Sequence, residues 1–128
     1  METTIFDGQG NPVAYLSDDY DRTIYLWDGH PVAYLYEEQH VYGFNGRHLG
    51  WFIEQVLYDE NGERVGFTFV SCPTAVAKEP VKSKKFPRDE ITSRWKVPAT
   101  PNLGFQPSTR PLADFLKQGR IVRVRPQP

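Results

Sequence analysis

Cysteine is almost absent from this chain of 128 residues, in which Cys72 is the only example. A single thiol excludes an intrachain disulfide and a cluster of thiolate metal ligands. No apolar run approaches the roughly 18 residues that a membrane span requires. The first ten residues, METTIFDGQG, contain no basic region followed by an apolar run. We therefore expect no signal peptide, no membrane partner and a cytoplasmic location.

Basic residues are scarce in the first half of the chain. Residues 1–70 carry twelve acids against three arginines, which gives a net charge of −9. Residues 71–128 carry twelve Lys or Arg against four acids, which gives +8, so the whole chain has a net charge of −1. We expect the basic part to neutralise the acidic part of the same chain or of another copy. Because acids and prolines interrupt the basic part, we do not expect it to bind nucleic acid.

Four related phrases fill the first half. They read IFDGQGNPVAYL, IYLWDGHPVAYL, VYGFNGRHLGWF and LYDENGERVGFT, and they share one glycine column: Gly10, Gly29, Gly46 and Gly62. Four residues after this glycine stands a small residue in every phrase: Ala14, Ala33, Gly50 and Gly66. Five residues after it stands an aromatic residue: Tyr15, Tyr34, Trp51 and Phe67. Columns matched in every unit indicate an internal structural repeat.

Each phrase predicts a β-hairpin. The pairs that end in the shared glycine, such as Asp28-Gly29, are typical of a two-residue turn with positive φ, and the flanking residues favour strands. Such a turn would place Tyr25 opposite Val32 and Ile24 opposite Ala33. Alternation then puts apolar side chains on both faces, so each hairpin should be covered on two sides.

The small residue within a strand indicates that a bulky group approaches closely there. We expect this group to come from the next hairpin, packed toward a common axis. We interpret the aromatic column as core rather than as the lining of a ligand groove. Eight short strands can then close as four petals about a pseudo-four-fold axis or as a small up-and-down barrel.

These phrases resemble a known family. The stretch HVYGFNGRHLGWFIEQVLYDENGERVGFTF and its sister phrases resemble the bacterial four-fold β-flower proteins, in which four hairpins surround a pseudo-four-fold axis. The closing STRPLADFLKQG resembles the C-terminal Pro-Leu-x-x-Phe-Leu element of that family. The resemblance implies a mostly β fold and supplies no catalytic residues. LYDENGERVG alone also resembles a strand-turn of PRC-barrel domains, and the aromatic-glycine hairpins resemble MORN and choline-binding repeats.

We divide the chain into three parts. Residues 1–70 form the four-hairpin domain. Residues 71–107 are rich in Pro and Lys and show no usable period, so we expect an extended or partly disordered segment. Three aromatic residues in this segment are costly to leave in water, which predicts some docking: Phe86, Trp95 and Phe105. Residues 108–128 contain one short helix and a basic end, RIVRVR, that alternates like an edge strand.

The short C-terminal helix is predicted at about residues 109–118. Ser108 or Thr109 can cap it, Pro111 is tolerated in its first turn, and Gly119 is suited to end it. One face is apolar at helical spacing: Leu112, Phe115 and Leu116. So short a helix does not persist alone, and we expect it to dock on an apolar surface of the hairpin domain.

No motif for catalysis, a cofactor or a metal is present, so we nominate no residues for these roles. His30, His40 and His48 fall at separate places in the phrases, and we expect them to project from different petals rather than to converge on a metal. Cys72 lacks a catalytic motif, and we expect a buried or idle thiol. Three acidic pairs lie in predicted turns, where they keep contact with water: Asp18-Asp19, Glu37-Glu38 and Asp59-Glu60.

Two classes of function remain open. The first is a non-catalytic binding or scaffold module that acts through protein–protein interaction. Its partner would be the chain's own basic tail, another protein or a second copy. The candidate partner-binding residues are Trp51, Tyr36, Leu112, Phe115 and Leu116. The alternative is a small hydrolase-like enzyme with a site assembled from scattered residues, which the lack of a catalytic motif disfavours.

Overall fold

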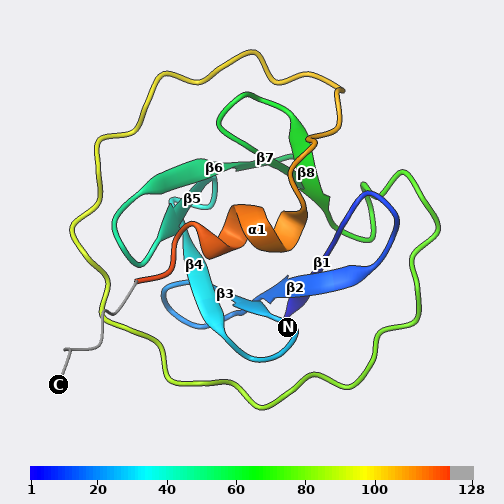
Figure 1. The fold of residues 1–128 in the computed structure, drawn as a ribbon, viewed down its shortest axis with the longest axis horizontal. Coiled ribbons are helices and arrows are strands. Elements are labelled where there is room, and N and C mark those ends of the chain that lie inside the picture. The colour runs from blue at the N-terminus through cyan, green and yellow to red at the C-terminus, as the bar shows by residue number, and fades with distance from the viewer. Residues whose placement is uncertain (122–128) are drawn as a thin grey trace, which may run out of the picture.

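The fold is a closed β-barrel that surrounds a short helix (Figure 1). The computed structural model describes residues 1–121, and its eight antiparallel strands follow one another around the barrel in chain order. The strands are β1 (Thr3–Phe6), β2 (Pro12–Leu16), β3 (Thr23–Leu26), β4 (Pro31–Tyr36), β5 (His40–Gly43), β6 (His48–Ile53), β7 (Val56–Tyr58) and β8 (Arg64–Phe67), and the helix is α1 (Leu112–Lys117). The predicted mostly β fold of four hairpins with a short C-terminal helix is confirmed, and the hairpins close as an up-and-down barrel.

The hairpin turns contain three residues, so the predicted two-residue turn is wrong. At the second hairpin the N–H of Gly29 donates to the Leu26 carbonyl oxygen (2.9 Å). The N–H of Leu26 in turn donates to the His30 carbonyl oxygen (2.8 Å). This pattern is a type I turn followed by one left-handed residue, a position that glycine occupies without strain. All four shared glycines have φ between 78° and 95°.

The longer turn changes the pairing of residues next to it. Ile24 lies opposite Ala33 as predicted, but the ladder then shifts by one residue. Tyr25 therefore lies opposite Pro31 and not opposite Val32. The same irregularity occurs at the equivalent place in the other three hairpins.

Tight two-residue turns occur instead between the hairpins. Glu37 and Glu38 have φ values of 52° and 59°, and Glu54 and Gln55 have φ values of 50° and 68°. Positive φ at both central residues defines the type I′ turn, which most often contains Asn-Gly. Neither of these joints contains glycine, so their sequence gives no signal for the turn that they form.

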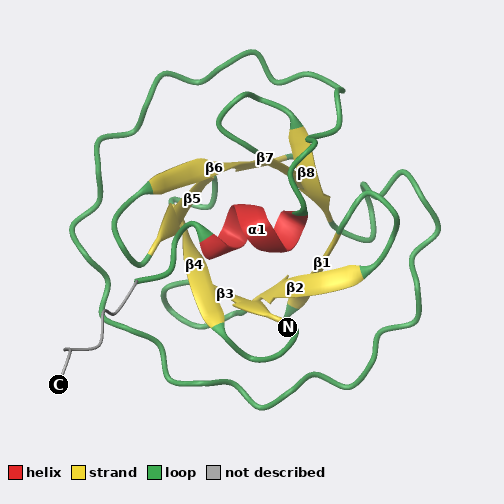
Figure 2. Ribbon diagram, viewed as in Figure 1, coloured by secondary structure: helices red, strands yellow, loops and turns green. Residues whose placement is uncertain are grey.

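Helix α1 fills the interior of the barrel (Figure 2). Its three apolar side chains are at most 2% exposed and belong to the same core cluster as the small residues of β2 and β4: Leu112, Phe115 and Leu116. A Cβ on Gly50 would lie 2.0 Å from the carbonyl oxygen of Tyr58 in the next hairpin and 3.0 Å from Phe115 Cζ of the helix. A Cβ on Gly66 would lie 3.0 Å from Leu112 Cδ1 and 3.2 Å from Ile5 Cγ2. The small column therefore makes room for the helix, together with the neighbouring hairpin that we expected.

The helix begins later than predicted. Pro111 is its N-cap residue and provides no side-chain hydrogen bond, so the predicted cap at Ser108 or Thr109 is wrong. The hydroxyl of Ser108 instead donates to the carboxylate of Asp59 (2.7 Å), which ties the chain before the helix to the fourth hairpin. Gly119 follows the C-cap residue Gln118, in agreement with its predicted place at the end.

Between β8 and α1 the chain passes once around the outside of the barrel (Figures 1 and 2). We call residues 73–107 of this segment the belt. The belt has no regular strand or helix, and one isolated bridge joins Pro107 to Arg64. Residues 122–128, which hold most of the predicted edge strand, lie outside the described residues. Within residues 1–121 no helix has the length and hydrophobicity needed to cross a membrane.

Candidate binding surface

The outer face of the barrel is a band of aromatic side chains that the belt covers. We call this band the girdle, and it comprises Tyr15, Tyr25, Trp27, Tyr34, Tyr36, Tyr42, Trp51, Tyr58 and Phe67. The members from the aromatic column are at most 5% exposed, so the column is buried as predicted, in part beneath the belt: Tyr15, Tyr34, Trp51 and Phe67. Belt residues such as Ile91 and Leu103 pack directly against the girdle.

The belt meets the four hairpin turns at intervals of nine residues. Four of its backbone N–H groups donate to the carbonyl oxygens of the shared glycines, at 2.8, 2.9, 2.8 and 3.2 Å: Ala77 to Gly10, Phe86 to Gly29, Trp95 to Gly46 and Gly104 to Gly62. A second series lies three residues earlier, where the N–H of Ser83 donates to Trp27 and the N–H of Thr92 donates to Phe44. The belt thus has a nine-residue period, although residues 71–107 show no usable period in their sequence.

The shared glycines are also the points of closest approach between belt and barrel. A Cβ on any of them would lie 2.1–2.3 Å from a belt carbonyl oxygen, those of Ala75, Lys84, Ser93 and Asn102. These four carbonyls are again nine residues apart. Glycine is therefore required here for contact with the belt as well as for its positive φ.

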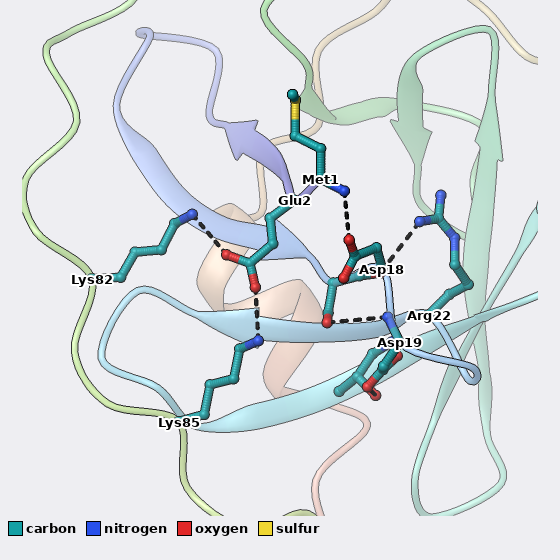
Figure 3. Close-up of polar contacts among 9 residues, drawn as sticks. Met1, Glu2, Asp18, Asp19, Arg22, Lys82 and Lys85 are labelled. Atoms are coloured by element: carbon teal, nitrogen blue, oxygen red, sulfur yellow. Dashed lines mark hydrogen bonds and ion pairs between the residues drawn. The ribbon is translucent and has the colours of Figure 1, made fainter.

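Two belt lysines lie over the aromatic rings of the first two hairpins. Figure 3 shows their side chains reaching the carboxylate of Glu2. Lys82 Nζ is 4.6 Å from the ring centroid of Tyr15 and 5.4 Å from that of Trp27. Lys85 Nζ is 5.1 Å from the centroid of Tyr25 and 5.7 Å from that of Tyr15. Both ammonium groups also pair with the carboxylate of Glu2, at 3.0 and 2.7 Å.

Glu2 and the lysines beside it stabilise each other's charges. Burial tends to raise the pKa of Glu2, but hydrogen bonds and charges from Lys85 and Lys82 outweigh it and hold this pKa below its ordinary value. The hydrogen bond to Glu2 is the main reason why the pKa of Lys85 is raised. Carboxylate and ammonium therefore stay ionised together over a wide pH range around neutrality.

Other parts of the girdle use arginine in place of lysine. Arg94 of the belt lies over the ring of Tyr36 (3.8 Å from guanidinium carbon to centroid) and donates to the hydroxyl of Tyr34 (3.4 Å). In the fourth hairpin the barrel supplies the cation and the belt supplies the ring. The guanidinium carbon of Arg64 in β8 lies 4.5 Å from the ring centroid of Phe105 in the belt. Cation–ring contacts thus join belt and barrel in several sectors.

Ion pairs and ring stacking add to the contact. Arg88 of the belt pairs with Asp21, and Arg110, just after the belt, pairs with Glu60 (2.9 Å). The ring of Phe86 stacks on His30 with centroids 4.3 Å apart and planes 12° apart. Basic residues of the second half therefore lie against acidic residues of the first half.

The predicted partner-binding residues lie in different environments. Trp51 is buried, with 2% of its surface exposed, and its Nε1 has no hydrogen-bond partner among residues 1–121. Tyr36 is half-buried under Arg94. Leu112, Phe115 and Leu116 lie inside the barrel, away from the girdle. Glu2, Lys82 and Lys85 are not among the predicted binding residues, because no sequence pattern connects these lysines with the aromatic column of the hairpins.

Two histidines that we expected on different petals are in contact. His40 Nδ1 lies 3.1 Å from His48 Nε2 across the third hairpin, and the His48 ring packs edge-on against Trp51. Burial, helped by the nearby His40, lowers the pKa of His48 to about 4.

Within residues 1–121, no three His, Cys, Asp or Glu side chains are grouped closely enough to hold a metal ion. The half-buried thiol of Cys72 points to the Asp7 carbonyl oxygen (3.6 Å).

Comparison with known proteins matches most of the chain to a protein family. A family model described as 4-fold beta flower protein matches residues 3–116, which include the barrel, the belt and most of α1. No curated protein and no solved structure matches the chain.

Proposed function

The chain belongs to the 4-fold beta flower family, and from this premise we propose that it is a non-catalytic binding module for extended, basic polypeptides. The girdle is the binding surface, and the belt is the ligand that occupies it in this structure. The observation that carries the proposal is the nine-residue period of backbone contacts along the four turns. Backbone hydrogen bonds hold an extended chain whatever its side chains are, and pockets for selected side chains add specificity.

The side chains of the belt vary while its backbone contacts repeat. The four residues that donate to the shared glycines are Ala77, Phe86, Trp95 and Gly104. A surface that accepts such different side chains at equivalent places can accept other polypeptides with a similar backbone path. We propose that the partner is a second copy or another protein with Lys or Arg spaced to reach the aromatic rings. A cytoplasmic location belongs to the proposal, since a chain with one cysteine needs no oxidising compartment.

A ligand in trans has to compete with the belt. A tethered segment acts at an effective concentration of about millimolar, so the belt weakens the apparent affinity for any external peptide. Changes that loosen the belt should therefore strengthen binding in trans. This relation between belt and ligand distinguishes binding at the girdle from binding elsewhere on the barrel.

The test uses the full chain and a fluorescein-labelled peptide with the sequence of residues 81–97. Fluorescence anisotropy should show saturable binding that is about ten-fold tighter for the Lys82→Glu/Lys85→Glu protein than for the unaltered chain. A peptide of the same composition in permuted order is the control and should bind much more weakly. Absence of saturable binding to both proteins, or equal binding of the two peptides, would contradict the proposal.

A further inference from the structure

Around Lys82 and Lys85 three aromatic rings and one carboxylate form a cage. Tyr15 comes from β2, Tyr25 from β3 and Trp27 from the turn after β3, while Glu2 precedes β1. The rings of Tyr15 and Tyr25 are stacked with centroids 5.6 Å apart. The ring of Trp27 stands at 90° to that of Tyr15, with centroids 5.8 Å apart. Together they make two walls at a right angle, which the Glu2 carboxylate closes on one side.

This arrangement is suited to an alkylammonium group. The face of each aromatic ring carries partial negative charge, and the attraction for a cation grows when both are withdrawn from water. Glu2 supplies a full negative charge and is 27% exposed, so solvent screens it only in part. The other cation–ring contacts within residues 1–121 use the guanidinium groups of Arg64 and Arg94. The two lysines thus mark the one sector of the described girdle in which an ammonium group meets both rings and a carboxylate.

We infer that Tyr15, Tyr25, Trp27 and Glu2 form a binding site for an alkylammonium group, specifically for a lysine side chain of a partner polypeptide. Lys82 and Lys85 fill this cage from within the chain and keep it closed. The identity of the ligand as a polypeptide rests on the proposed function, whereas the cage can be tested with a small cation alone.

The lysines that close the cage are placed so that they can leave it. Their side chains remain 30% and 43% exposed, and they come from the belt rather than from a strand. One carboxylate serves two ammonium groups, so the loss of one lysine leaves Glu2 paired with the other. A partner lysine can therefore enter beside Trp27 or Tyr25 without leaving a buried unpaired charge.

The direct test vacates the cage in the full chain with Lys82→Ala/Lys85→Ala and adds tetramethylammonium chloride. The readout is the indole N–H signal of Trp27 in a ¹H–¹⁵N spectrum, assigned with Trp27→Phe. We expect a saturable shift with an affinity about ten-fold higher than for the unaltered chain. The variant Lys78→Ala/Lys84→Ala removes two exposed belt lysines outside the cage and should behave as the unaltered chain does.

Two further measurements distinguish the binding of a cation in the cage from general apolar binding. Adding Glu2→Gln to the double variant should weaken tetramethylammonium binding several-fold, and tert-butyl alcohol, which has a similar shape and no charge, should not produce the saturable shift. Equal effects of the two probes, or no shift in a folded double variant, would overturn the inference. Near-UV circular dichroism checks folding. If the double variant is unfolded, Lys82→Ala, which keeps the Lys85–Glu2 pair, is titrated in its place and judged by the same outcomes.

A peptide experiment identifies the source of the ammonium group. In the 81–97 peptide, replacing Lys82 and Lys85 with Gln should reduce the affinity about ten-fold, whereas replacing Lys84 with Gln should have little effect. If the peptide binds equally well with Gln in the cage, the girdle still binds peptides but the cage is not a lysine site. If tetramethylammonium binds while no peptide does, the cage takes small ammonium ions, and both the assignment to a partner lysine and the proposed function are wrong.

Discussion

At the scale of single residues, the shared glycines meet two requirements at once. Gly29 has a φ of 95°, and a Cβ there would lie 2.1 Å from the Lys84 carbonyl oxygen. The positive φ could be predicted from the Asp-Gly pair, because the pair is typical of hairpin turns. The contact with the belt could not be predicted, because the atom that meets Gly29 belongs to the backbone and leaves no mark on the sequence at position 84.

The replacement Gly29→Ala should lower the free energy of unfolding by about 2–3 kcal/mol, because it adds backbone strain and displaces the belt. Urea denaturation followed by tryptophan fluorescence measures this change. Gly8→Ala is the matched control, since its Cβ would meet only Phe67 Cε2 at an ordinary distance of 3.8 Å. Similar losses for the two variants would show that the glycines are not points of belt contact.

The contact between His40 and His48 is a second feature at this scale. The predicted two-residue turn gives no reason for the two histidines to meet. The three-residue turn places Tyr42 opposite His48 and His40 opposite Trp51. The histidine rings then meet on the same face of the hairpin. Their proximity therefore depends on turn geometry and not on the pattern of residue types.

Stability should fall as the pH drops from about 6.5 toward 4. His48 has a pKa of about 4 in the folded protein, below its ordinary value of 6.5, because of burial and the nearby His40. Between these values the unfolded chain binds more protons than the folded one, so acid favours unfolding. We expect a loss of about 1–2 kcal/mol from this residue, since the ring is only half-buried and solvent screens part of the effect. Urea midpoints between pH 7 and 4 should fall less in His48→Gln than in the unaltered chain, and an equal fall in both would contradict this account.

At the scale of elements, the sequence predicted the hairpins and their order but not the way in which they turn. The turn position of the four shared glycines and the pairing of Ile24 with Ala33 are confirmed, because alternation and small residues determine which faces meet. The type of turn was missed because Asp-Gly and Asn-Gly fit both a two-residue turn and a type I turn with a following glycine. The period of the belt was missed because its contacts are made by the backbone, which any residue except proline can provide.

The joint between β6 and β7 offers a stabilising change. Glu54 and Gln55 both have positive φ, which costs a residue with a side chain about 1 kcal/mol or more relative to glycine. Glu54→Asn/Gln55→Gly should raise the free energy of unfolding by about 1 kcal/mol and increase the melting temperature. The control Gln55→Ala retains the unfavourable φ and should not be stabilised. A lower melting temperature for the Asn-Gly variant would mean that this joint is not a type I′ turn.

At the scale of the whole molecule, the belt links the outside of the barrel to its inside. It leaves β8, passes each hairpin turn once and returns the chain to α1 at the centre (Figure 1). The helix could be predicted from the spacing of Leu112, Phe115 and Leu116, but its place inside the barrel could not, since both faces of each hairpin are apolar. The interior needs the helix because the small column leaves space there, and the girdle needs the belt because its aromatic rings would otherwise face water.

The central claim is that the belt is held to the four turns in a nine-residue register. Residue-resolved amide hydrogen exchange on the full chain tests it most directly. The account predicts slow exchange at Ala77, Phe86, Trp95 and Gly104, whose N–H groups donate to the shared glycines. It predicts faster exchange at the residues just before them, Val76, Lys85, Arg94 and Leu103, which donate no backbone hydrogen bond to the rest of residues 1–121. Uniformly fast exchange from residue 73 to residue 107 would contradict it.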